Sequence, residues 1–212
     1  MKKFIISLIV VVIIFLAIRY ATKTAVITPS PSPSVDLSNT YIGSGFTIQL
    51  PLLATSTAST SEAYTVLATH TYQASPIKII PGVRFTVPSS IATGTNLSSD
   101  TYISVETLPA ALTSTATSSC SADMFFDGVH KTIEQTINGV DYSVASSSGA
   151  GAGNRYEETV YALPSTQPCR GVRYLIHYGV LQNYPEGTVQ EFDKAKLITE
   201  FDAIRDTVKV GL

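Results

Sequence analysis

The pattern of hydrophobic and polar positions divides the chain into one long apolar run, a series of short alternating runs, and one helical stripe at the end. The apolar run covers Phe4–Ile18, in which only Ser7 is polar, and it lies between Lys2-Lys3 and Arg19. A secretory signal holds an apolar stretch of ~7–15 residues, whereas a membrane-spanning helix needs ~17–25. The run therefore fits a signal peptide or, extended through residue 21, a membrane span.

The flanks of the apolar run favour a retained anchor. Cleavage after Ala21 or Ala25 places Arg19 or Lys23 at a position that prefers a small residue, and no Cys follows to carry a lipid. We therefore expect residues 1–21 to form a signal-anchor helix, with a cleaved signal peptide as the alternative. Basic residues on both sides weaken the positive-inside signal, but a short N-terminal tail before a long C-terminal domain favours an exported domain.

A proline-rich segment follows the predicted anchor. Residues 28–34 read TPSPSPS, a composition that favours extended polyproline II structure and cannot pack a core. We expect residues 22–39 to be a tether and residues 40–212 to be an extracytoplasmic domain. The localisation that follows is a single-pass protein of the cell membrane.

Short runs of alternating or β-branched residues predict an antiparallel sheet in the domain. Asn138-Gly139 lies between two such runs and supplies the positive φ angles of a type I′ hairpin turn. We expect polar loops at residues 53–63, 89–99 and 146–154. The predicted strands cover residues 46–50, 64–72, 78–87, 101–108, 132–137, 140–145, 155–163 and 171–181.

The end of the chain changes to a helical period. Apolar residues at 197, 198, 201 and 204 form one stripe of a predicted helix over residues 192–207, and Asp193 is a candidate N-cap. Val208 and Val210 either add a terminal strand or pack beneath this helix. The predicted fold class is therefore α+β, an antiparallel β-sheet packed by a C-terminal α-helix, behind an N-terminal transmembrane helix.

The distribution of charge argues against nucleic acid as a partner. The first four charged residues are basic, which leaves ten Lys and Arg against all sixteen Asp and Glu in the rest of the chain. Binding to phosphates needs a basic face, and an acidic domain lacks one. The expected partners are the membrane, through the single anchor, and an envelope protein or small ligand that the sequence does not identify.

The chain has two cysteines, Cys120 and Cys169. Outside the cytoplasm one structural disulfide is the simplest interpretation, and free or reactive thiols are the alternative. No C-x-x-C motif is present, and two thiols alone rarely hold zinc. We expect Cys120 to fix a short helical turn, within residues 120–130, to the predicted sheet.

Candidate chemistry is sparse. The three histidines have no metal-ligand spacing, and the glycine-rich residues 149–154 precede a strand where a dinucleotide site needs a helix, so we predict no metal and no cofactor. His177 alternates with Arg173 on one predicted strand, and Glu157 lies on the neighbouring one. These three residues are the candidate site of a small hydrolase. Glu157 and Glu158 point to opposite faces of a strand and cannot act together.

Two segments resemble PsbP/Mog1-like domains. Residues 41–51 (YIGSGFTIQLP) are similar to the opening hairpin of that family, and residues 201–210 (FDAIRDTVKV) to its closing helix and edge segment. The whole chain also looks like small bacterial proteins with one anchor and an exported domain. The family resemblance implies an antiparallel sheet covered by helices, used mostly for binding or assembly, and it implies no site residues.

These observations give two hypotheses for function. The leading one is a membrane-anchored extracytoplasmic binding or assembly module without enzymatic activity. The alternative is a small cell-envelope hydrolase with a site assembled around His177. The two differ in whether His177 meets a carboxylate in an accessible pocket.

Overall fold

A computed structural model of the chain describes residues 35–54, 62–110 and 119–211. The predicted anchor, residues 1–21, and most of the predicted tether, residues 22–39, lie outside these ranges and stay predictions. Within the described ranges no helix is long and apolar enough to cross a membrane. Most of the predicted polar loop at residues 53–63 also lies outside them.

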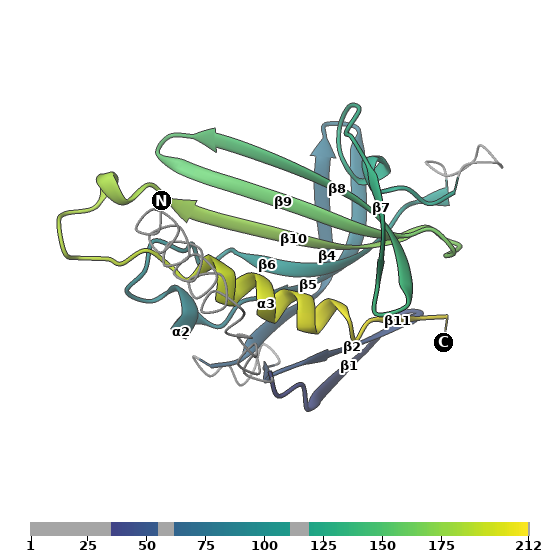
Figure 1. Cartoon of the computed structure of the whole chain (residues 1–212), viewed down its shortest axis with the longest axis horizontal. Helices are drawn as coiled ribbons and strands as arrows, with labels where there is room; N and C mark the ends of the chain where they lie inside the picture. The colour runs from purple at the N-terminus through teal and green to yellow at the C-terminus, as the bar shows by residue number, and fades with distance from the viewer. Residues whose placement is uncertain (1–34, 55–61, 111–118, 212) are drawn as a thin grey trace, which may run out of the picture. The chain divides into compact units, whose positions relative to one another are not determined.

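The domain is built on an eight-stranded sheet, shown in Figure 1. Every neighbouring pair is antiparallel except the parallel pair β3–β4. Seven of the eight predicted strands lie in this sheet, and the eighth, residues 46–50, lies in a second sheet. The remaining strand, β3, was not predicted, because it falls at the start of the predicted loop 53–63. In spatial order the sheet contains β3 (Leu53–Ala54), β4 (Tyr64–Ser75), β5 (Lys78–Thr86), β6 (Tyr102–Thr107), β10 (Arg170–Gly179), β9 (Asn154–Leu163), β8 (Val140–Gly151) and β7 (Ile133–Ile137).

A second, three-stranded sheet joins the two ends of the domain. It consists of β1 (Asn39–Gly43), β2 (Phe46–Leu50) and β11 (Lys209–Val210), in that order and antiparallel throughout. The strand pair β2–β11 brings residues 46–47 and 209–210 together. The terminal strand that the sequence suggested is therefore present, at Lys209–Val210.

The predicted C-terminal helix is α3 (Lys194–Arg205). Asp193 caps it, because its carboxylate accepts a hydrogen bond from the Lys196 backbone N–H at 2.9 Å. Shorter helical turns are α2 (Ser89–Ala92), η2 (Ala122–Phe125) and η3 (Leu181–Asn183). A mostly antiparallel β structure with one long C-terminal helix confirms the α+β class.

Helix α3 and the three-stranded sheet cover one face of the large sheet (Figure 1). Alternate residues of β10 point to this face, and those that pack beneath α3 are buried. Tyr174 also donates its hydroxyl hydrogen bond to the Phe201 carbonyl at 3.0 Å. This apolar core includes Ile48, Leu50, Phe85, Ile103, Val105, Val172, Tyr174, Ile176, Leu197, Phe201 and Ile204.

The opposite face is covered in part by the segment around η2. Cys120 and Cys169 form the predicted disulfide, with an S–S distance of 2.06 Å. Phe125 and Phe126 pack into a second buried cluster with Val160 of β9. The predicted helical turn is present as a 3₁₀ turn, and the disulfide joins Cys120, two residues before this turn, to Cys169, the residue before β10.

Two turns test the prediction of hairpins. The predicted Asn138-Gly139 turn between β7 and β8 is confirmed, with φ angles of 51° and 80°. The predicted loop at residues 146–154 is wrong, because β8 continues through Gly151 in pairing with β9 and a second tight turn follows at Ala152-Gly153. Small polar side chains gave no strand pattern there, but the ladder needs only backbone donors and acceptors.

Candidate functional site

The structure does not bring together the three residues of the predicted hydrolase site. Arg173 and His177 share one face of β10, the face opposite α3. Glu157 lies on the α3 side of β9, where its carboxylate accepts hydrogen bonds from the Tyr178 hydroxyl at 2.8 Å and from the Lys194 ammonium. The sheet therefore separates Glu157 from the other two side chains.

His177 meets a different carboxylate. Its Nδ1 lies 2.7 Å from Oδ1 of Asp100, and its ring stacks on Tyr156 with 4.3 Å between ring centroids. Its Nε2 is buried and has no hydrogen-bond partner among the described residues. A general base needs one ring nitrogen within reach of a substrate proton, so this packing does not present Nε2 to a substrate.

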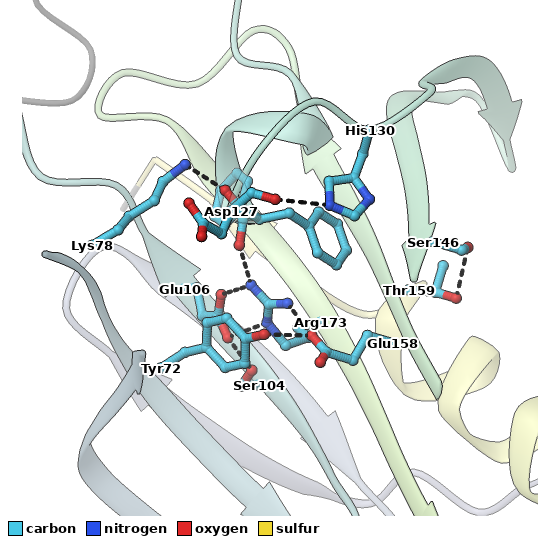
Figure 2. Close-up of polar contacts among 12 residues, drawn as sticks. Tyr72, Lys78, Ser104, Glu106, Asp127, His130, Ser146, Glu158, Thr159 and Arg173 are labelled. Carbon is cyan, nitrogen blue, oxygen red and sulfur yellow. Dashed lines mark hydrogen bonds and ion pairs between the residues drawn. The ribbon is translucent and has the colours of Figure 1, made fainter. Parts of the chain in front are cut away.

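Arg173 is the centre of a buried ionic cluster, drawn in Figure 2. Its side chain is completely buried and contacts both carboxylate oxygens of Glu106, at 2.9 and 3.0 Å. It also donates to Glu158 at 2.6 Å and to the Phe125 carbonyl at 2.8 Å. Burial lowers the pKa of the Arg173 guanidinium, but the two carboxylates outweigh that effect and the pKa is raised overall. The arginine is therefore charged at any working pH.

Neighbouring side chains complete this cluster. The Arg173 guanidinium lies 3.5 Å from the ring centroid of Tyr72, and the Tyr72 hydroxyl donates to Glu158 at 2.7 Å. The Ser104 hydroxyl donates to Glu106 at 2.9 Å. Because the guanidinium is hydrogen-bonded to both carboxylates, the cluster has the properties of a structural element. It links β4, β6, β9 and β10 to the η2 segment.

A pocket of about 540 Å³ lies on the other side of the sheet, between α2 and α3. Its apolar surface comes from prolines and from Ile91, Phe192 and Leu197. Its polar surface comes from the first turns of α3 and from the start of β4. The lining consists of Pro51, Glu62, Tyr64, Pro88, Ser90, Ile91, Thr95, Phe192, Asp193, Lys196, Leu197 and Glu200.

The charges that line this α2–α3 pocket are mostly negative. Glu62, Asp193 and Glu200 are opposed by one lysine, Lys196. The Tyr64 hydroxyl donates to Oε1 of Glu200 at 2.6 Å, and burial together with that carboxylate raises the pKa of Tyr64. Tyr64 therefore stays protonated and fixes Glu200, and the pocket combines an apolar wall with a negative potential.

Comparison with protein-family models and with curated proteins finds no match to this chain. The resemblance to PsbP/Mog1-like domains stays a prediction.

Metal chemistry receives no support from the described part of the chain. Within residues 35–54, 62–110 and 119–211 no three His, Cys, Asp or Glu side chains come close enough to hold a metal ion. The α2–α3 pocket was not predicted from the sequence, because its lining comes from two segments, residues 51–95 and 192–200, that are far apart in the chain. The only local signal was the N-cap Asp193, which marks where the helix begins but not what packs beside it.

Proposed function

We propose that the described domain is a binding module and that the α2–α3 pocket is its ligand site. The observation that carries this proposal is the pairing of an apolar wall with three carboxylates in one cavity. Binding pockets are mostly apolar, with a few polar groups that fix the orientation of the ligand. The resemblance to PsbP/Mog1-like domains points in the same direction.

The expected ligand carries a cationic group on an apolar body. Ile91, Phe192 and Leu197 offer contacts to the apolar body, while Glu200 offers a fixed carboxylate to an ammonium or guanidinium group. Tyr64 is already committed to Glu200 as a donor, so the remaining lone pairs of that carboxylate are directed to other donors. An envelope protein with an exposed basic side chain and a small organic amine both present this chemistry.

We place this module outside the cytoplasm, on the membrane. The Cys120–Cys169 disulfide supports an oxidising compartment, because structural disulfides are rare in the cytosol. The predicted anchor at residues 1–21 and tether at residues 22–39 would hold the domain beside the bilayer. Labelling of free thiols in intact and in reduced protein from the membrane fraction tests this placement.

The alternative, a hydrolase around His177, has weaker support. Its one favourable feature is the contact between His177 and Asp100, which could orient the imidazole. Against it, Nε2 of His177 is buried, and Glu157 and Arg173 are engaged in separate contacts on opposite faces of the sheet. We therefore do not advance it as a second function.

Calorimetric titration of the full chain in neutral detergent tests the pocket. The probe is phenethylammonium, which joins an ammonium group to an aromatic ring, and its neutral counterpart is 2-phenylethanol. We expect the ammonium to bind more tightly than the alcohol, and Glu200→Gln to weaken its binding about ten-fold because a charged hydrogen bond is lost. The matched control is Glu134→Gln, an exposed carboxylate on β7 outside the pocket.

Two results contradict the proposal. Equal affinity for phenethylammonium and 2-phenylethanol removes the role of the carboxylates. Equal affinity of the Glu200→Gln and Glu134→Gln variants for phenethylammonium shows that it does not bind at Glu200 in the α2–α3 pocket. If Glu200→Gln alters the far-ultraviolet circular dichroism spectrum, Glu62→Gln on the exposed rim replaces it.

A further inference from the structure

The sheet face opposite α3 carries a second group of polar residues, next to the Arg173 cluster. Arg84 on β5 lies directly across from Ser104 on β6, and His70 lies on the adjoining strand β4. Both approach the ring of Tyr102: the Arg84 guanidinium at 5.4 Å and the His70 ring at 5.2 Å from its centroid. Two nitrogen-rich side chains thus meet at one aromatic ring.

Hydrogen bonding in this group is incomplete. His70 is only 9 % exposed, yet its Nε2 is buried without a partner among the described residues. Nε of Arg84 is also buried and has no hydrogen-bond partner among the described residues. Within the described ranges Arg84 forms no ion pair. Buried polar groups are rarely left without partners. Nε2 of His177 also lacks a partner, but that ring is stacked on Tyr156 and bonded to Asp100, whereas His70 lies beside an arginine that has no ion pair of its own. The two atoms on neighbouring strands therefore indicate a missing acceptor.

The adjacent Arg173 gives an internal comparison. Arg173 contacts Glu106 and Glu158, whereas Arg84 has only the face of an aromatic ring. A guanidinium fork matches the two oxygens of a carboxylate. The protein's own side chains supply carboxylates to Arg173, but none of the described carboxylates contacts Arg84.

We propose that Arg84 and His70, with the ring of Tyr102 as a wall, bind the carboxylate group of an organic acid. Arg84 supplies the only positive charge of this group, since burial and the nearby Arg84 and Arg173 lower the pKa of His70 to about 4 and leave it neutral. Leu67, 41 % exposed, pairs with Arg84 across the strands and offers contact to an apolar body. This carboxylate site lies on the opposite sheet face from the α2–α3 pocket and does not depend on it.

Histidine NMR on the full chain in neutral detergent tests the site directly. The chain has three histidines, so selective ¹³C labelling gives three ring signals. Benzoate is the probe, with inorganic phosphate as the comparison anion. We expect benzoate to move the His70 signal and to raise its pKa from about 4, because a bound anion stabilises the imidazolium form. The signals of His130 and His177 serve as internal references.

Variants separate the proposed contacts from general effects. Arg84→Gln removes the charge, and we expect it to weaken benzoate binding about ten-fold or more. Arg155→Gln removes an exposed arginine elsewhere on the sheet and should leave affinity unchanged. If Arg84→Gln fails to fold, Arg84→Lys keeps the charge but not the fork and should show intermediate affinity.

The possible results divide clearly. A shift of the His70 signal that Arg84→Gln abolishes and Arg155→Gln keeps supports the site. Three outcomes overturn it: no response of His70 to benzoate, an equal response in the Arg84→Gln variant, or tighter binding of phosphate than of benzoate. This experiment uses benzoate and not phenethylammonium. A negative result therefore contradicts the carboxylate site but not the proposed ligand site in the α2–α3 pocket.

Discussion

The two faces of the large sheet are buried by different chemistry. Beneath α3 the buried side chains are almost all apolar, with Phe201, Leu197 and Ile204 packed on Val172 and Tyr174 of β10. On the other face the same strand places a fully buried arginine, and the neighbouring strand adds a fully buried glutamate. One sheet therefore contains both an apolar core and an ionic one.

This difference predicts different responses to mutation. An apolar core gains stability in proportion to the surface removed from water, so its losses scale with the volume deleted. A buried ionic cluster is stable only while each charge keeps its partner, so deleting one partner costs more than deleting both.

Truncation of a core aromatic on the helix side should have the largest effect. Phe201 is completely buried between α3 and β10. We expect Phe201→Ala to lower the free energy of unfolding by about 4 kcal/mol, through lost transfer energy and the cavity left behind. Urea unfolding followed by tyrosine fluorescence measures this, since the chain has no Trp. The control, Thr199→Ala on the exposed side of α3, should change it by less than about 0.5 kcal/mol.

Removal of one charge from the ionic face should come next. Arg173→Met keeps apolar volume but leaves Glu106, which is 0 % exposed, without its cation. We expect a loss of about 3 kcal/mol in the free energy of unfolding.

The double variant Arg173→Met/Glu106→Leu sharpens the contrast between the faces. It removes both buried charges and should recover more than half of the loss. A double variant that is less stable than Arg173→Met would show that removing both partners of this ion pair costs more than removing one, against the expectation for a buried ion pair. The same urea titration gives both values.

The ionic face should also be the more sensitive to acid. The pKa of His70 is about 4 in the folded chain, below the value of 6.5 for an unperturbed histidine, first because of burial and then because of Arg84 and Arg173. The unfolded chain therefore binds a proton first as the pH falls. This contribution to stability is fully present above pH 6.5 and is lost as the pH falls to about 4.

We expect this loss to be on the order of 2 kcal/mol, discounted for partial solvation. It should disappear in His70→Phe, which keeps the ring contact with Tyr102 and cannot titrate. The measurement is the urea midpoint at a series of pH values for both proteins. Identical slopes for the two between pH 6.5 and 4.5 would exclude His70 as the source.

Most of the fold could be predicted from local patterns. Alternation located the strands, a period of 3.6 located α3, and Asn138-Gly139 located a hairpin, because each feature depends on residues that are neighbours in sequence. The error at residues 146–154 has the same origin. The Ser, Gly and Ala residues there show no apolar alternation, although they continue strand β8, which pairs with β9 as far as Gly151.

The candidate sites could be predicted far less well. The sequence placed Arg173 and His177 correctly on one strand face, but their partners Glu106 and Asp100 come from a segment about 70 residues earlier. Which carboxylate meets which cation depends on strand order, and the strand order of this sheet is not sequential. The pattern of single strands contains no information on that order.

The smallest effect concerns the residue that links the helix-side core to the α2–α3 pocket. Asp193 caps α3 and also lines the pocket, so one carboxylate contributes to both stability and ligand binding. We expect Asp193→Ala to lower the free energy of unfolding by about 1 kcal/mol, whereas Asp193→Ser keeps a capping oxygen and should restore most of it. Both variants lose the negative charge, so both should bind phenethylammonium more weakly than the parent chain. If the affinity follows stability and not charge, the pocket does not select a cation.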